Sequence, residues 1–180
     1  MRIIAGELKG RKLNTPIGDE IRPTTDKVKE ALFSSIQFEL PDSIVLDLYA
    51  GTGSLGLEAL SRGAKKCYFS DNDRKSIELI RQNIELCNMT ERSIVLRGDA
   101  TENLSRIKEG IDMIFMDPPY FEADYLRAIE RIIELDLLNE FGRISCEHSS
   151  SIALPDDFQG LNKIREKKYG RIMLTMYEKE

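Results

Sequence analysis

Cysteine and histidine are scarce in this sequence. It holds three cysteines, Cys67, Cys87 and Cys146, and one histidine, His148. The cysteines are odd in number and far apart, so they match no zinc or disulfide pattern. We expect them to be buried structural thiols in a reducing cytoplasm, and we expect no metal site. His148 lies just past a predicted strand, and we interpret it as structural or peripheral.

Long apolar runs are also absent. No run is long enough to span a bilayer, and charges in the opening "MRIIAGELKGRKL" interrupt its apolar residues before a signal-peptide core could form. With 41% hydrophobic and 32% charged residues the composition is that of a globular protein, and 180 residues suit one domain with a small appendage. We therefore expect a cytoplasmic monomer that does not engage a membrane.

The chain has no overall excess of positive charge. Its net charge of −5 argues against a generally basic nucleic-acid binder, although net charge hides distribution. Residues 1–12 carry four cations against Glu7, and residues 163–171 carry five against Glu166. Two interpretations stay open, namely a locally basic surface on an acidic body and two solvated edges.

Strand-like apolar runs alternate with segments of helical periodicity from residue 43 onward. Predicted strands cover 43–51, 65–71, 93–100, 111–119 and 142–148, and predicted helices cover 54–64, 73–88, 101–109 and 123–135. This alternation indicates an α/β fold with a mostly parallel sheet, covered on both faces by helices. In such sheets ligands bind at the carboxyl ends of the strands.

The two ends of the chain carry additional elements. Residues 2–16 predict a small hairpin that turns at 7–10, and residues 22–38 predict a helix capped by Thr24 or Thr25. Residues 162–179 predict two strands that turn at Tyr169–Gly170. We therefore divide the chain into an N-terminal β-hairpin extension at 1–20 and a main domain at 21–180.

A glycine loop, "GTGSLG" at residues 51–56, follows the first parallel strand. Asp71 comes twenty residues after Gly51, where a dinucleotide-binding protein places the acid that accepts ribose hydroxyls. Asp47, four residues before Gly51, would be poorly placed beside a pyrophosphate but suits a ligand with an ammonium and a sulfonium. The loop therefore favours S-adenosylmethionine over NAD. A tight turn without a ligand is the alternative, and for Asp99 a helix cap is as plausible as an adenine contact.

The segment "DPPY", Asp117 to Tyr120, ends the fourth parallel strand. An exocyclic amine on a base must pyramidalise before it attacks a methyl sulfonium, and an acceptor for each N–H favours that change. Asp117 can accept one hydrogen bond and the Pro118 carbonyl the other, in a direction that Pro118 and Pro119 fix in advance. Tyr120 can stack on the base. The alternative is a turn that only terminates the strand.

These motifs carry a resemblance. The run "DLYAGTGSLGLEALSRGA", the acid at Asp71, "GDA" and "DPPY" are similar to class I methyltransferases that modify exocyclic amines. With "RIIAGELKGRKL" and "IRPTTDKVKEALF", nearly the whole chain resembles the bacterial 16S rRNA guanine-N2 methyltransferase family called RsmD. This implies a Rossmann-like sheet of seven strands with an antiparallel last strand, and S-adenosylmethionine-dependent methyl transfer to a guanine N2 in 16S rRNA or the small ribosomal subunit.

The resemblance also assigns residues. The family more often has Glu at the position of Asp71, so the ribose contact is expected to be longer or water-mediated. The catalytic turn is Asp117, Pro118, Pro119 and Tyr120. We expect the two basic segments, 1–12 and 163–171, to hold the RNA, chiefly through Arg2, Lys9, Arg11 and Lys12. Arg22 is a further RNA contact, although Arg22 and Thr25 could instead only cap the helix that follows them. The predicted cofactor site consists of Thr25, Asp47, Tyr49, Ala50, Gly51, Gly53, Asp71, Asn72, Asp99 and Ala100.

Three other functions stay open. One keeps the chemistry but changes the acceptor to a DNA adenine or a protein glutamine, although the chain has no obvious DNA-recognition domain. Another is a non-catalytic RNA-binding protein on a methyltransferase fold, which the intact glycine loop and "DPPY" disfavour. The last is an NAD-dependent oxidoreductase.

Overall fold

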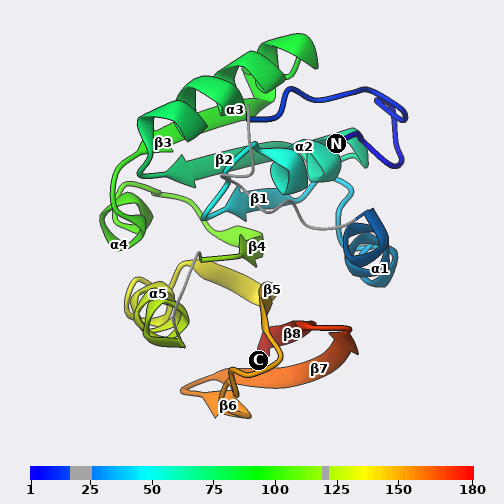
Figure 1. Ribbon diagram of the computed structural model, residues 1–180. Coiled ribbons are helices and arrows are strands. Elements are labelled where there is room, and N and C mark those ends of the chain that lie inside the picture. The colour runs from blue at the N-terminus through cyan, green and yellow to red at the C-terminus, as the bar shows by residue number, and fades with distance from the viewer. Residues whose placement is uncertain (17–25, 119–121) are drawn as a thin grey trace.

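The computed structural model describes residues 1–16, 26–118 and 122–180. These residues form one sheet with the strand order β3-β2-β1-β4-β5-β8-β7-β6, which runs from top to bottom in Figure 1. The parallel strands are β1 (Ile44–Asp47), β2 (Lys66–Asp71), β3 (Ser93–Arg97), β4 (Ile111–Met116) and β5 (Leu138–Ser149).

The C-terminal strands change direction. Strand β8 (Ile172–Lys179) is antiparallel to both of its neighbours, β5 and β7 (Leu161–Tyr169), so β7 runs parallel to β5. The expected seven strands with an antiparallel last strand are found, but β6 (Asp157–Phe158) adds an eighth. Because β6 pairs only two residues with β7, it is too short to give a periodic signal in the sequence.

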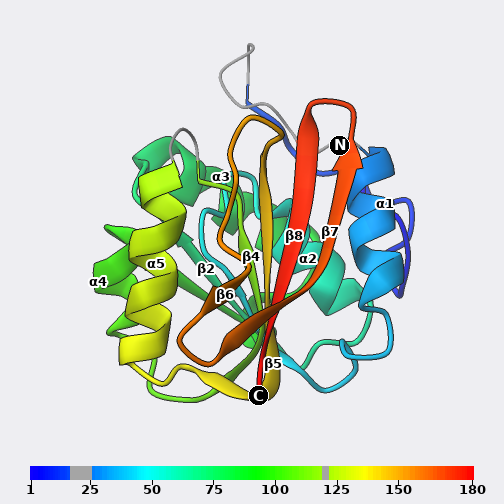
Figure 2. The same cartoon turned by 90° about the horizontal axis from the view of Figure 1, so that it is seen from below.

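Helices cover both faces of the sheet, as Figure 2 shows edge-on. One face carries α1 (Asp26–Ser35), α2 (Ser54–Ser61) and α3 (Arg74–Leu86), and the other carries α4 (Ala100–Leu104) and α5 (Glu122–Glu134). A 3₁₀ turn at Thr90–Arg92 precedes β3. The middle residues of β2, which is covered on both sides, are all buried, as a parallel strand requires.

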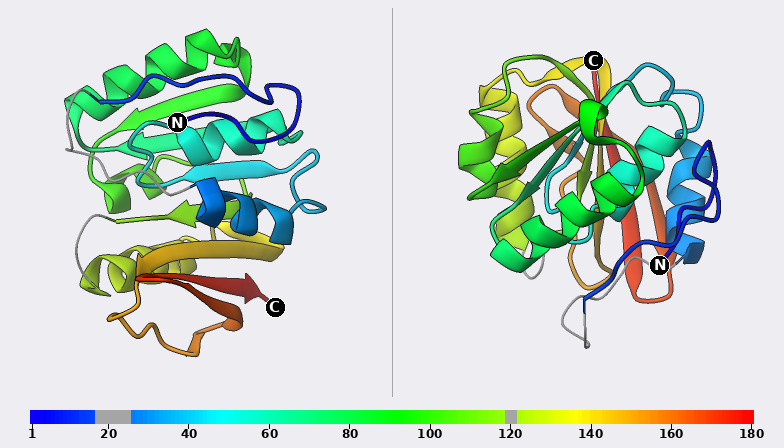
Figure 3. Two further views of the ribbon diagram at one scale, coloured as in Figure 1. Left: turned by 45° about the vertical axis from the view of Figure 1, so that its right-hand side comes forward. Right: turned by 90° about the horizontal axis from the view of Figure 1, so that it is seen from above.

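The expected N-terminal hairpin is present but short: Arg2 and Lys12 form an antiparallel bridge, and Ile3 bonds through its backbone to Arg11 and Gly10, each at 2.9 Å. Ile4 and Ala5 donate their backbone N–H groups to the Glu58 carboxylate of α2, at 2.8 and 3.0 Å, and so use bonds that a strand ladder would need. Ile3 is fully buried in the core, and the segment crosses α2 and α3 (Figure 3). The domain boundary between residues 20 and 21 lies outside the described residues and stays a prediction.

Candidate active site at the carboxyl edge of the sheet

The carboxyl ends of β1, β2 and β4 meet around one loop. Leu48 donates its N–H to the Phe115 carbonyl of β4 at 3.0 Å, and Ala50 donates to the Ser70 carbonyl of β2 at 2.9 Å. The segment that follows β1 is therefore fixed between two neighbouring strands before it enters the glycine loop. This places Tyr49, half-buried, and Ala50, buried, at the centre of the edge.

The glycines of the loop have separate structural reasons. Gly51 and Gly53 have φ angles of 56° and 77°, which favour glycine, and Gly53 directly precedes α2. Gly56 lies against β2: a Cβ there would be 2.3 Å from Cε1 of Phe69. The loop thus turns tightly and brings the first turn of α2 close to the sheet, and its glycines need no ligand to explain them.

Asp47 bonds to the last residue of this loop. Its carboxylate accepts a hydrogen bond from the Gly56 N–H at 2.9 Å, and only 3% of the residue is exposed. Burial raises the pKa of Asp47 to about 7, against the opposing effect of that hydrogen bond. The carboxylate therefore has a structural partner within the loop, and its direct contact with a ligand cation stays a prediction.

Asp71 lies at the end of β2 and is half-buried. Its two oxygens accept the N–H groups of Gly51 and Asp73, each at 2.9 Å, which ties the glycine loop to the turn before α3. Burial raises the pKa of this carboxyl, and the backbone hydrogen bonds oppose the shift. Each carboxylate oxygen keeps a further acceptor position, so ribose hydroxyls can still bind there. Asn72, next to it, is exposed.

Asp99 caps α4. Its carboxylate accepts the Thr101 N–H at 2.9 Å and the Thr101 hydroxyl at 2.5 Å, which lower its pKa. Arg127 of α5 lies 3.6 Å away. Of the two interpretations left open, the helix cap is therefore the one present, and an adenine contact by Asp99 stays a prediction. Ala100, the first residue of α4, packs against the core between α4 and α5.

The catalytic turn is described only in its first half. Asp117 is half-buried and Pro118 is buried, whereas Pro119 and Tyr120 lie outside the described residues, as do Thr25 and Arg22. Tyr125 of α5 lies close to Asp117. The pKa of the Tyr125 hydroxyl is raised, mainly by burial and to a smaller extent by the Asp117 carboxylate. That hydroxyl donates to the Glu147 carbonyl of β5 at 2.5 Å, which fixes α5 against the strand next to the turn.

The structure agrees with a structural role for His148. The residue is 4% exposed, and its ring packs edge-on against Tyr125, with ring centroids 5.9 Å apart. Nε2 lies 2.8 Å from the Thr175 hydroxyl and Nδ1 lies 3.0 Å from the Ser149 carbonyl. Burial lowers the pKa of the imidazole, so the neutral ring is favoured.

A buried ion pair was missed by the sequence analysis. Lys29 of α1 and Glu58 of α2 are almost completely buried, with Nζ and Oε2 3.0 Å apart. Lys29 also donates to the Ser54 hydroxyl, at 2.9 Å, and to the Arg2 carbonyl, at 3.1 Å. It thus joins α1, the glycine loop and the N-terminal segment. The available signal was a charged residue within the buried stripe of each helix.

The four predicted RNA contacts that the structure describes, Arg2, Lys9, Arg11 and Lys12, are exposed but do not cluster at the site. Arg2 lies near it, because Met1 accepts a hydrogen bond from the Thr52 hydroxyl of the glycine loop and Arg2 pairs with Asp26 at 3.5 Å. Leu8 instead bonds to Ser61, at the far end of α2, which is about 12 Å from its start. Lys9, which follows, is therefore remote from the catalytic turn. Arg11 and Lys12 lie on the returning part of the segment.

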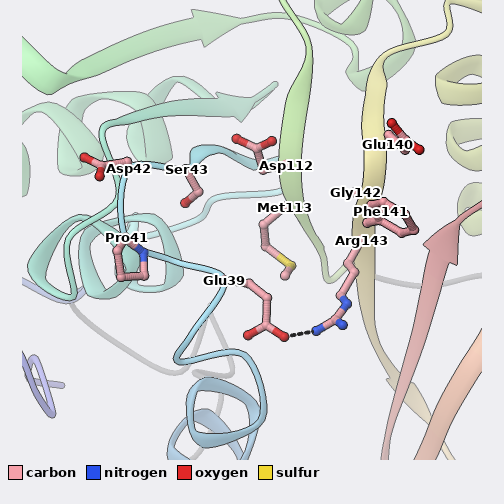
Figure 4. A pocket seen from close by; sticks show the side chains of 10 residues that line it. All are labelled: Glu39, Pro41, Asp42, Ser43, Asp112, Met113, Glu140, Phe141, Gly142 and Arg143. Atoms are coloured by element: carbon pink, nitrogen blue, oxygen red, sulfur yellow. Dashed lines mark hydrogen bonds and ion pairs between the residues drawn. The ribbon is translucent and has the colours of Figure 1, made fainter.

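A separate cavity of about 300 Å³ lies at the opposite edge of the sheet (Figure 4). Ser43 and Asp112, at the amino ends of β1 and β4, line it, and the Glu39–Arg143 ion pair crosses it. It shares no residue with the carboxyl edge.

Among the described residues no group of three or more His, Cys, Asp and Glu could hold a metal ion, and no helix in this part of the chain could cross a membrane.

Comparisons with known proteins agree with this architecture. A family model described as Conserved hypothetical protein 95 matches residues 1–178. The chain is 39% identical over 182 residues to YlbH of Bacillus subtilis, for which an rRNA methyltransferase activity is proposed, and the match covers 99% of both proteins. It is 31% identical over 180 residues to Ribosomal RNA small subunit methyltransferase D of Escherichia coli, covering 100% of this chain and 90% of that protein.

The similarity extends to solved structures. The Escherichia coli protein yhhF, for which a methyltransferase activity is proposed, matches with a TM-score of 0.91 and 29% identity, over 100% of this chain and 98% of the other. The expected Rossmann-like class I methyltransferase fold is thereby confirmed.

Proposed function

The chain belongs to the Conserved hypothetical protein 95 family, and from this premise we propose that it transfers a methyl group from S-adenosylmethionine to the exocyclic N2 of a guanine in small-subunit rRNA. The observation that carries the proposal is the meeting of the glycine loop, Asp71 and Asp117 at one edge of the sheet. The names of the relatives, which include small-subunit rRNA methyltransferases, support RNA as the acceptor.

The residues at β1 and β2 fit the cofactor. The half-buried Asp71 carboxylate has acceptor positions left for two ribose hydroxyls, and the turn through Gly51 and Gly53 brings backbone rather than side chains to the place beside it. In this proposal the amino-acid end of the cofactor lies beside Asp47 and Tyr49, at the end of β1. When bound, S-adenosylmethionine supplies the electrophilic methyl group on its sulfonium.

The acceptor chemistry belongs to the end of β4. Asp117 and the Pro118 carbonyl accept hydrogen bonds from the two N–H groups of the amine, which favours a pyramidal nitrogen with an available lone pair. Pro118 is buried. In this proposal the rings of Pro118 and Pro119 fix the direction of the carbonyl between them. In this proposal Tyr120 stacks on the guanine and holds it in line for transfer.

The test uses small ribosomal subunits from a strain that lacks this enzyme, incubated with purified protein and methyl-tritiated S-adenosylmethionine. Tritium should appear in 16S rRNA as N2-methylguanine at one position. Label in ribosomal protein or in adenine would contradict the proposed acceptor. Parallel titrations with S-adenosylhomocysteine and NADH separate the cofactors, since only the former should bind.

A further inference from the structure

The β7–β8 hairpin carries four exposed positive charges, Arg165, Lys167, Lys168 and Arg171, which are called the hairpin cations below. None of them forms an ion pair with an acidic side chain that the structure describes. Glu166, the one acid between them, instead bonds to Lys163 at 3.1 Å and to the Thr175 hydroxyl at 3.2 Å.

The strand register places the hairpin cations level with the catalytic turn. Lys167 of β7 pairs with Leu174 of β8, and Leu174 pairs with Glu147 of β5. In the next pair of strands, Cys146 of β5 pairs with Met116 of β4. The residues that follow them, Glu147 and Asp117, are therefore also level with each other. Lys167 and Asp117 thus lie at the same height, three strand spacings apart, which is roughly 14 Å.

The tip of the hairpin is anchored at the same edge. Ser150, just past β5, donates its N–H to the Arg171 carbonyl at 2.9 Å. Since β7 runs parallel to β5, the residues from Lys167 to Arg171 extend beyond the end of β4 toward the side from which a substrate must approach.

The outer side of β7 is open. Strand β6 pairs only with Leu161 and Asn162, so no described backbone pairs with β7 on that side from residue 164 onward. Arg165 and Lys167 lie on the α1 face, where they line a small cavity of about 10 Å³ beside Ala31 and Ser35. Lys167 also lies over the ring of Tyr169, 5.4 Å from its centroid.

The other half of the same edge carries acidic side chains. Asp71 ends β2, and Asp73 and Asp99, both exposed, follow β2 and β3. An RNA chain that delivers its guanine to Asp117 therefore meets acids on one side and cations on the other.

We propose that the hairpin cations bind the phosphate backbone of the RNA next to the acceptor nucleotide. This inference rests on the proposed function and adds a surface on the acceptor side of the catalytic turn, distant from the N-terminal segment. In Figure 1 the N-terminus lies level with α2, whereas β7 lies at the other end of the sheet. Lysines on an open edge strand can also serve only to prevent edge-to-edge pairing, which is the competing explanation.

The experiment compares two fourfold variants with equal charge change. The hairpin variant replaces Arg165, Lys167, Lys168 and Arg171 with Gln. The control variant replaces four exposed cations elsewhere, Lys65, Arg81, Arg97 and Lys108, with Gln. Affinity for full-length 16S rRNA and for undermethylated small subunits is measured as a function of salt concentration, and methylation is measured by steady-state kinetics. Calorimetry with S-adenosylhomocysteine gives the cofactor affinity, and light scattering detects self-association of the protein.

The hairpin variant should bind RNA at least 10-fold more weakly at 0.15 M salt, with a salt slope lower by about 2–3, since each contact to single-stranded RNA contributes about 0.7. KM for subunits should rise, with kcat and S-adenosylhomocysteine affinity unchanged, and the control variant should behave as wild type. Equal RNA binding by the two variants would overturn the inference, as would self-association of the hairpin variant with unchanged RNA affinity. If wild type binds RNA through the hairpin but transfers no methyl group, only the proposed reaction is wrong.

Discussion

The two halves of the carboxyl edge differ in charge and in construction. The half formed by β1, β2 and β3 ends in carboxylates that bond to backbone N–H groups of the adjoining loops, as Asp71 does with Gly51. The half formed by β5, β8 and β7 ends in serines and exposed cations at an open hairpin. Strand β4, with Asp117, lies between them.

The comparison indicates how one sheet can bind two ligands of opposite character. A cofactor with hydroxyls and positive charge suits a rigid acidic half, where hydrogen bonds fix the loops in advance. A polyanion suits a basic half whose side chains are exposed and can follow the backbone of the RNA. The predictions below test whether the halves act separately.

The largest effect is expected between the halves, at Asp117. If its carboxylate acts on the amine as it pyramidalises, Asp117→Ala should lower kcat by ~10²–10³-fold, the usual scale for one preorganised electrostatic partner. Affinity for S-adenosylhomocysteine should change little. Single-turnover methylation with saturating cofactor measures this, with folding checked by a thermal melt. A folded variant with a near-normal rate would mean that the Pro118–Pro119 turn only terminates the strand.

Asp47 should give the cofactor half a pH-dependent stability. Burial raises its pKa to about 7, so the folded state holds a proton that the unfolded state releases near pH 4. The contribution of Asp47 to the free energy of unfolding is therefore present at low pH. It is lost as pH rises from about 4 to 7, by up to about 4 kcal/mol. Asp47→Asn keeps an acceptor for Gly56 and removes the titration. Urea unfolding of both proteins from pH 4 to 8 should show the free energy of unfolding of the wild type falling relative to that of Asp47→Asn as pH rises. A difference between the two proteins that does not change with pH would exclude this role.

Asp71→Ala should weaken the cofactor half alone. Loss of hydrogen bonds to a charged acceptor costs roughly 1.5–3 kcal/mol, which is about 10–100-fold in affinity for S-adenosylhomocysteine. RNA affinity should stay at the wild-type value if the halves are independent. Calorimetry and RNA titration on the same preparation test both parts, with Asp73→Ala, at the neighbouring cap of α3, as the control. Unchanged cofactor affinity would remove Asp71 from the site.

The smallest effect is expected from the N-terminal cations. Deletion of residues 1–12 is not a clean test, because Ile3 is buried in the core and Glu58 binds this segment. The double substitution Lys9→Gln and Arg11→Gln avoids that problem. Because Lys9 lies beyond the far end of α2, we expect a less than threefold loss of RNA affinity and a salt-slope change of at most about 1.4. A loss as large as that of the hairpin variant would move the main RNA contact to the N-terminal segment.

The order of strands and helices was predictable because it depends on local periodicity and glycine positions. The alternation from residue 43 onward gave β1 to β5 and the helices between them, with boundaries shifted by a few residues. The N-terminal hairpin is shorter than predicted, because the N–H groups of Ile4 and Ala5 bond to Glu58, a residue more than fifty positions away, instead of to the opposite arm.

The sequence by itself determined which chemical groups end each strand, since "GTGSLG", Asp71, Asp99 and Asp117 all follow apolar runs. Only the tertiary structure decided what those groups bond to: Asp47 to Gly56, Asp99 to the start of α4, and Lys29 to both α2 and the N-terminal segment. It also decided that Lys9 lies away from the site and that Lys167 lies level with Asp117. The reason is physical: spacing along the chain sets local geometry, whereas hydrogen bonds, burial and register across the sheet depend on residues that meet only after folding.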